Sequence, residues 1–205
     1  MIINIKKHRV QHGDIMNGIS ELMKEEKADF IYTDPPWGNT MKYWHTLNFK
    51  QNGKITTPTQ YDEFMNKFFS IIKYYAEDRI IIEFGQRWRG DIITLCKKYN
   101  LLHNECTQGF YKSGSKFLPF DIHFISKKEK FSLNESMKET CRKYHGLNLV
   151  QEIFNFYCPK NTKIVLDPFC GMGYTAKATL DRNMIFRGNE VNKKRLEKTI
   201  HRLAT

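Results

Sequence analysis

The chain has 205 residues, of which 40% are hydrophobic, and a formal net charge of +11. This composition predicts one packed domain and excludes an intrinsically disordered chain. No segment approaches the roughly 18 consecutive apolar residues that cross a bilayer, and the polar stretch from Met1 to Val10 lacks the apolar core of a secretory signal, so we expect a cytoplasmic protein. The positive charge favours a polyanionic partner, most simply nucleic acid.

Apolar runs alternate with helical patterns along the chain, which predicts an α/β domain with a mostly parallel sheet of about seven strands. Two of these strands flank Pro119 and a Ser-Gly-Ser sequence, and we expect them to pair as an antiparallel hairpin at the sheet edge. In chain order the expected elements are a strand over 9–14, a helix over 16–26, a strand over 29–33, a loop over 38–59, a helix over 60–76, a strand over 79–84, a helix over 91–99, strands over 103–111 and 120–126, a charged linker over 127–143, a helix over 147–157, a strand over 163–166, a helix over 173–181, a strand over 184–187 and a basic helix over 192–203.

The cysteine and histidine spacing gives no sign of a metal site. The five cysteines are far apart and form no Cys-x-x-Cys pair, which argues against zinc and predicts reduced thiols. His103, His123 and His145 lack metal-ligand spacing as well. We therefore expect these histidines to be structural and the chain to hold no metal.

The tetrapeptide Asp34-Pro35-Pro36-Trp37 directly follows a predicted strand, and open parallel sheets bind ligands at that end of their strands. The amino nitrogen of a nucleobase is a poor nucleophile, because its lone pair is delocalised into the ring. Two acceptors that capture both N–H groups free that lone pair for attack on a methyl group. Asp34 offers a carboxylate and Pro35 a carbonyl of restricted direction, while Trp37 offers a face for stacking the base. The alternative is a turn with a packed tryptophan.

A second motif runs from Val165 to Gly173 (V-L-D-P-F-C-G-M-G) and predicts a strand, a glycine loop and a helix start. Glycines allow close approach of the backbone to a ligand, and the helix N-terminus favours a carboxylate such as that of S-adenosylmethionine (AdoMet). Glu190, after the next strand, suits ribose hydroxyls. A dinucleotide loop remains an alternative, because Ala176 occupies the tolerated third position of G-x-G-x-x-G/A.

Together the two motifs resemble those of the DNA amino-methyltransferases of the N6-adenine and N4-cytosine type, in which D-P-P-[YW] is catalytic and D-P-F-x-G-x-G binds AdoMet. The order of the motifs resembles the circularly permuted β group, and the resemblance covers nearly the whole chain. It implies an AdoMet-methyltransferase (Rossmann-like) fold in one domain over 1–205, with a catalytic half over 1–126, the linker over 127–143 and an AdoMet-binding half over 144–205. The cofactor-binding residues that it implies are Gly13, Asp14, Asp167, Pro168, Phe169, Gly171, Gly173, Thr175 and Glu190.

The chain departs from this family in two places. Tyr144-His145-Gly146 stands where Lys-Pro is frequent in the family, which puts contacts from that segment in doubt. Only 127–143 is available for a target-recognition region, which is too short for a domain. We therefore expect weak sequence recognition, recognition through the loop over 38–59, or a homodimer or partner subunit that supplies it.

Basic and aromatic residues near the catalytic motif are candidates for contact with nucleic acid. Lys42 is a candidate for a phosphate contact, with a solvated loop as the alternative. Tyr43 and Trp44 are candidates for supporting base flipping or for forming a lid. Arg87 and Arg89 could line the groove, but packing by the intervening Trp88 with solvated arginines is the simpler interpretation.

The resemblance implies methylation of adenine N6 in DNA by a bacterial or phage enzyme, because aspartate rather than serine opens the catalytic motif. Cytosine-N4 methylation of DNA and adenine-N6 methylation of RNA are the alternatives within the class. A non-catalytic nucleic-acid-binding subunit and a dinucleotide-dependent oxidoreductase are the alternatives outside it.

Overall fold

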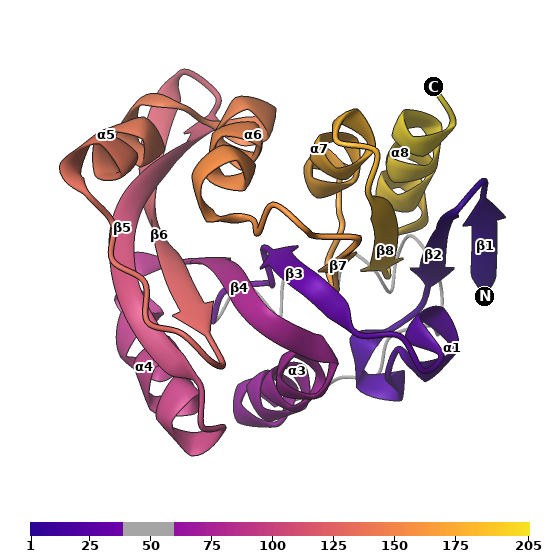
Figure 1. Ribbon diagram of the computed structural model, residues 1–205, viewed down its shortest axis with the longest axis horizontal. Coiled ribbons are helices and arrows are strands. Elements are labelled where there is room, and N and C mark those ends of the chain that lie inside the picture. The colour runs from indigo at the N-terminus through magenta and orange to yellow at the C-terminus, as the bar shows by residue number, and fades with distance from the viewer. Residues whose placement is uncertain (39–59) are drawn as a thin grey trace.

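The computed structural model describes residues 1–38 and 60–205, and within these ranges eight strands form one sheet with helices on both faces (Figure 1). The strands are β1 (Ile2–Ile5), β2 (His8–His12), β3 (Ala28–Thr33), β4 (Ala76–Phe84), β5 (Leu102–Ser113), β6 (Lys116–Ser126), β7 (Ile164–Asp167) and β8 (Ile185–Glu190). The α-helices are α1 (Ser20–Met23), α3 (Tyr61–Tyr75), α4 (Arg89–Lys98), α5 (Glu135–Lys143), α6 (Gly146–Tyr157), α7 (Tyr174–Asp181) and α8 (Lys193–Ala204), and two short 3-10 helices are η1 (Ile15–Asn17) and η2 (Gln86–Trp88).

The strand order is β1-β2-β8-β7-β3-β4-β6-β5. The pairs β2–β8, β8–β7, β7–β3 and β3–β4 are parallel, whereas β1 and the β5–β6 hairpin are added antiparallel at the two edges. After β7 the chain crosses to β8 on one side of the sheet centre, and after β3 it crosses to β4 on the opposite side. β3 and β7 therefore flank the switch point, where open α/β sheets bind ligands.

The alternation of side chains along β3 and β4 creates two hydrophobic cores. Ile31, Ile80 and Ile82 pack with α3, and Phe30 and Ile81, which point the opposite way, pack with α6. Figure 1 shows the corresponding layers: α1, α3 and α4 cover one face of the sheet, and α5, α6, α7 and α8 cover the other. A sheet covered on both faces explains why its central strands are almost continuously apolar.

Two sequence predictions were wrong in detail. The helix expected over 16–26 is instead η1 followed by α1, because Gly18 at φ +80° interrupts it and Lys24 at φ +54° ends it. Helix α5 occupies the second half of the expected linker; the Asn134 side chain accepts a hydrogen bond from the Met137 nitrogen at its start, and Cys141 is buried. The mostly parallel sheet and its antiparallel edge hairpin are confirmed, with β1 as an additional strand.

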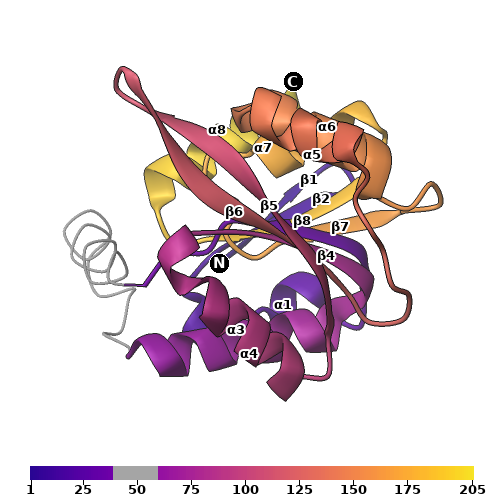
Figure 2. The same ribbon diagram turned by 90° about the vertical axis from the view of Figure 1, so that its left-hand side faces the viewer.

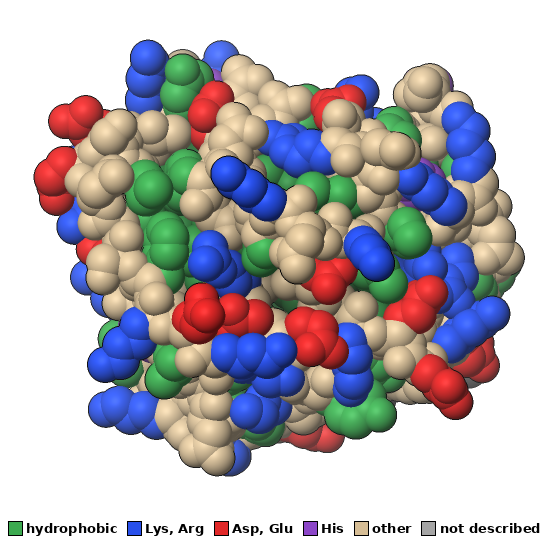
Figure 3. Space-filling model, viewed as in Figure 1, with side chains coloured by type: hydrophobic (Ala, Val, Ile, Leu, Met, Phe, Trp, Pro, Cys, Tyr) green, Lys and Arg blue, Asp and Glu red, His purple; other side chains and the backbone are tan. Residues whose placement is uncertain are grey.

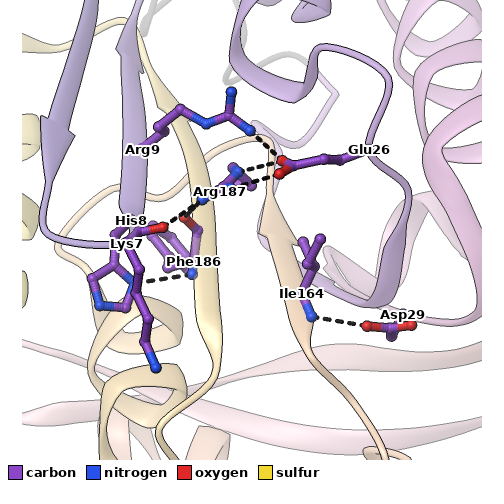
Figure 4. Close-up of polar contacts among 8 residues, drawn as sticks. All are labelled: Lys7, His8, Arg9, Glu26, Asp29, Ile164, Phe186 and Arg187. Carbon is purple, nitrogen blue, oxygen red and sulfur yellow. Dashed lines mark hydrogen bonds and ion pairs between the residues drawn. The ribbon is translucent and has the colours of Figure 1, made fainter.

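An ion-pair cluster joins the N-terminal strands to the C-terminal half of the chain (Figure 4). Glu26 accepts two hydrogen bonds from Arg187 on β8, at 2.7 and 2.9 Å, and also pairs with Arg9 on β2. These hydrogen bonds, with Arg187 the largest contributor, lower the pKa of Glu26. Asp29, on β3, accepts a hydrogen bond of 2.8 Å from the Ile164 nitrogen at the start of β7. Polar contacts therefore join β2 to β8 and β3 to β7.

The positive net charge does not gather into one patch on the face seen in Figure 3, where lysine and arginine side chains alternate with acidic and uncharged ones. Among the helices in the described ranges, none is long and apolar enough to cross a membrane.

Candidate active site

The two sequence motifs meet at one edge of the sheet. β3 ends at Thr33, directly before Asp34, and its neighbour β7 ends at Asp167. The strands are parallel, with Ile31 opposite Leu166, so their C-terminal ends lie side by side. More than a hundred residues of sequence separate these two aspartates, yet Asp34 directly follows β3 and Asp167 ends the adjacent strand β7.

The tetrapeptide Asp34-Pro35-Pro36-Trp37 holds its own aspartate in place. The Trp37 Nε1–H donates a 2.9 Å hydrogen bond to Asp34 Oδ1. The Trp37 ring stacks on Phe120 at 6.1 Å and meets Tyr111 edge-on at 5.6 Å, both from the β5–β6 hairpin. Figure 2 shows this hairpin extending beyond the sheet on the side where β3 ends. Trp37 thus orients the Asp34 carboxylate, a role that the sequence motif did not reveal.

Asp34 is open to solvent, but the protein around it still withdraws enough water to raise its pKa to about 6. The hydrogen bond from Trp37 and the charge of Arg195 act in the opposite direction and favour the anion. Pro35 is buried and Pro36 half-buried. Neither proline has an N–H to continue the ladder of β3. Asp34 is therefore an acceptor that is largely ionised at neutral pH at the end of a rigid strand.

The glycine loop is shaped by an aspartate that caps its first turn and by close packing between the start of α7 and α8. Asp167 is buried, its Oδ1 accepts a 3.1 Å hydrogen bond from the Phe169 nitrogen, and burial raises its pKa to about 7. Gly173 begins α7 at φ +79°, where a Cβ atom would lie 2.9 Å from the Thr199 Cα on α8. Only glycine fits there, because both the backbone angle and the space exclude a side chain.

Three of the predicted cofactor residues contact neighbouring elements and so support the glycine loop. Phe169 packs against Phe64 and Phe68 of α3, with ring centroids 5.6 and 5.4 Å apart. Pro168 is buried and its carbonyl accepts a 3.1 Å hydrogen bond from Asn189, and Thr175 is buried at the start of α7. Their side chains fix the course of the loop.

The remaining predicted cofactor residues come together beside the loop. Glu190 Oε2 accepts a 2.9 Å hydrogen bond from the Gly171 nitrogen, and the Glu190 carbonyl accepts one of 3.2 Å from the Gly13 nitrogen. Asp14 follows Gly13 and caps η1 by accepting a 2.9 Å hydrogen bond from the Met16 nitrogen. Burial raises the pKa of Glu190. The Gly13-Asp14 pair therefore lies next to both the glycine loop and Glu190.

Glu83 is a site residue that the sequence patterns missed. It lies on β4, and the parallel register pairs Thr33 with Ile82, so the next positions along the two strands are Asp34 and Glu83. The Tyr32 hydroxyl donates a 2.5 Å hydrogen bond to Glu83 Oε1. Burial, and then the charge of Asp34, raise the pKa of Glu83 to about 8. An acidic residue between the apolar run Ile80–Ile82 and Phe84 was the available signal.

The nucleic-acid candidates divide into two groups. Lys42, Tyr43 and Trp44 lie outside the described residues. Arg87 is exposed, whereas Arg89 donates two hydrogen bonds to the buried Asp121, at 2.6 and 2.8 Å. A nucleic-acid role for both arginines stays a prediction.

Trp88 packs where the sequence interpretation placed it. A Cβ atom on Gly38 would lie 2.0 Å from its indole ring, and one on Gly85 2.8 Å from it. Trp88 therefore packs closely against the backbone at Gly38 and Gly85.

Cys106, Asp121 and His123 lie with their ligand atoms within 4.8 Å of one another, a cluster that linear spacing did not reveal. Both Asp121 oxygens already accept hydrogen bonds from Arg89, and burial raises the pKa of the Cys106 thiol to about 12. The Arg89 guanidinium already supplies the positive charge that a metal ion would bring to Asp121. We therefore interpret the cluster as an ion-pair site that joins β6 to α4.

No protein-family model and no curated protein sequence matches the chain. Among solved structures it is similar to M1.HpyAVI in its SAM complex (TM-score 0.65, 19% identity, 95% of this chain and 98% of that one). It is also similar to a putative DNA modification methylase from Thermus thermophilus (0.64, 18%, 96% and 94%) and to the cytosine-N4-specific PvuII DNA methyltransferase (0.66, 12%, 97% and 87%). The chain therefore has the methyltransferase fold that its motif pair predicted.

Proposed function

We propose that this chain transfers the methyl group of AdoMet to the exocyclic N6 of adenine in DNA. The observation that carries the proposal is the position of Asp34 and the glycine loop at the ends of adjacent strands β3 and β7. An acceptor for an amino group and a loop suited to a nucleoside cofactor then face one edge of the sheet. The structurally similar PvuII DNA methyltransferase and the putative DNA modification methylase from Thermus thermophilus support the same class of reaction, and the SAM complex of M1.HpyAVI supports the cofactor.

The residues beside the loop fit AdoMet. Each oxygen of Glu190 accepts one backbone N–H, at 2.9 and 2.7 Å, and a carboxylate oxygen has capacity for a further donor. Glu190 would hold the ribose hydroxyls, and the N-terminus of α7 would favour the methionyl carboxylate. Gly13 and Asp14 would border the adenine end. When bound, AdoMet supplies an activated methyl group on a sulfonium.

The chain's own residues prepare the target base. A base inside a duplex must leave the stack to reach the edge of the sheet. Asp34 and the Pro35 carbonyl would accept the two N–H groups of the amino nitrogen, which frees its lone pair. The hydrogen bond from Trp37 holds Asp34 in position before the base arrives, so little reorganisation remains for the reacting state. The carboxylate also stabilises the positive charge that develops on the nitrogen.

The test is transfer of labelled methyl to DNA and to RNA, followed by nucleoside mass spectrometry. We expect N6-methyladenine from DNA, and a loss of about 10²–10³-fold in rate for Asp34→Asn, by comparison with other preorganised acceptor and donor groups. AdoMet binding of the variant by calorimetry is the control for folding. Methylcytosine would assign the N4 activity, and methyladenine only in RNA the RNA activity. Full activity of Asp34→Asn would refute the mechanism.

We also infer that target choice requires a homodimer or a partner subunit, because 127–143 is too short for a recognition domain. Light scattering tests the homodimer directly, and a monomeric mass with full methylation activity would remove the need for either.

A further inference from the structure

Two carboxyl groups occupy neighbouring positions at the C-terminal ends of β3 and β4. Thr33 pairs with Ile82 in the parallel register of β3 and β4, so Asp34 and Glu83 lie at the same level of adjacent strands. Tyr32 is two residues before Asp34 and donates its 2.5 Å hydrogen bond to Glu83, which places Glu83 on the face of the sheet that Tyr32 and Asp34 share.

Among residues 1–38 and 60–205, the groups that the electrostatics place around Glu83 provide no positive charge to stabilise its anion. They are Tyr32 and Asp34 from β3 and its extension, Asp167 from β7, and Cys141 from α5. No lysine or arginine in the described ranges forms an ion pair with Glu83. Arg195, the cation that acts on Asp34, is not among the charges that shift Glu83. Two adjacent carboxyl groups under these conditions cannot both ionise without a large penalty.

We propose that Glu83 is the counter-ion of the methyl donor: its carboxyl stays uncharged in the free protein and loses its proton when the sulfonium binds beside Asp34. This inference rests on the proposed function. Methyl transfer requires the sulfonium to lie next to the amino nitrogen that Asp34 binds, so the cation must enter this group of carboxyls. The proton passes to solvent, and the bound state gains one negative charge at Glu83 for the positive charge of the sulfonium.

The electrostatics of the free protein agree with this exchange. Burial is the largest cause and the charge of Asp34 the next in raising the pKa of Glu83 to about 8. The two carboxyl groups therefore favour a state with a single proton, and burial together with the Asp34 charge favours that proton on Glu83, whereas Trp37 and Arg195 favour the anion of Asp34. A cation placed among these groups favours the charged form of Glu83 and lowers its pKa, so binding and proton release are linked.

The experiment is calorimetric titration of AdoMet into the full chain at pH 7 in two buffers of different ionisation enthalpy, which counts the protons released. S-adenosylhomocysteine is the matched ligand, because it differs from AdoMet only in lacking the sulfur-bound methyl group, which leaves its sulfur neutral. We expect AdoMet to release more protons than S-adenosylhomocysteine, by a large fraction of one proton, and this difference to vanish in Glu83→Gln. Equal release for both ligands in the natural protein would overturn the proposal, as would an undiminished difference in Glu83→Gln.

Two controls separate this inference from other outcomes. Glu77→Gln changes an exposed glutamate at the other end of β4 and should keep the full difference between the ligands. Glu83→Gln should retain the hydrogen bond from Tyr32, since an amide oxygen also accepts, and a circular dichroism spectrum and thermal unfolding confirm that it folds. Absence of any AdoMet binding by the natural protein would defeat the proposed function itself, whereas binding without the extra proton defeats only the role of Glu83.

Discussion

Gly173 gives the sharpest test of how the glycine loop is built. Alanine there must adopt φ +79°, which costs a residue with a Cβ about 1–2 kcal/mol. The new Cβ would also lie 2.8 Å from the Thr199 Oγ1 and 2.9 Å from its Cα, and overpacking of this kind costs typically about 1–3 kcal/mol. The Thr199 hydroxyl donates to the Gly171 carbonyl at 3.0 Å, so relief of the clash disturbs the same loop.

We expect Gly173→Ala to lower the free energy of unfolding by about 2–4 kcal/mol, which for a chain of this size lowers the melting temperature by about 5–15 °C. Thermal and urea unfolding measure it, and calorimetry should show weakened AdoMet binding. Gly90→Ala is the matched control, because Gly90 lies in α4 and a Cβ atom added there would meet no atom within 4 Å, and alanine should stabilise that helix by up to about 1 kcal/mol. Equal melting temperatures for Gly173→Ala and the natural protein would refute the reasoning.

Two further predictions concern ion pairs. Glu26→Gln should lower the free energy of unfolding by about 2–4 kcal/mol in urea, somewhat less than for a deeply buried pair because Glu26 is 34% exposed; the neighbouring exposed Glu25→Gln should have almost no effect. Burial alone would raise the pKa of Asp121, but hydrogen bonds and charge from Arg89 outweigh burial and lower it. The stability that Asp121 contributes is therefore present above its unfolded pKa near 4 and is lost as the pH falls through its lower folded value. Unfolding measured from pH 7 to pH 3 should show a shallower acid decline for Asp121→Asn, and an unchanged decline would contradict the pairing.

The sequence predicted best those features that depend on local pattern. The spacing of Phe64, Phe68 and Ile72 defines α3, whose buried face it indeed forms. The strand-loop-helix run from Val165 to Gly173 likewise gives β7 and α7. By contrast, the apolar spacing of the first helix continues across Gly18, where a single backbone angle stops it.

Glu83 was missed for a different physical reason. Its importance comes from a register between two strands that are far apart in sequence, β3 and β4, and a sequence pattern on one strand does not contain the neighbour's register. Helix α5 was missed because only Met137 and Cys141 pack toward the core, too narrow an apolar stripe to stand out in a charged segment. The failure to predict Glu83 and α5 has a common cause: each depends on which residues lie next to it in the folded protein, and the spacing of residues along the sequence does not contain that information.

The order of the two motifs along the chain is compatible with the site because sheet topology, rather than sequence order, brings them together. Asp34 needs only that β3 lie beside β7, and the ladder that starts at Phe30 and Val165 provides this. The crossovers from these two strands diverge, so the space above the switch point stays clear of their connections. The tetrapeptide at Asp34 and the glycine loop therefore reach one edge of the sheet although they are far apart in the sequence. The constraint that remains is electrostatic. Bringing the two motifs together also gathers Asp34, Glu83 and Asp167, and the pKa of each is raised. The AdoMet binding that we propose would bring a cation to these carboxyl groups and relieve their repulsion.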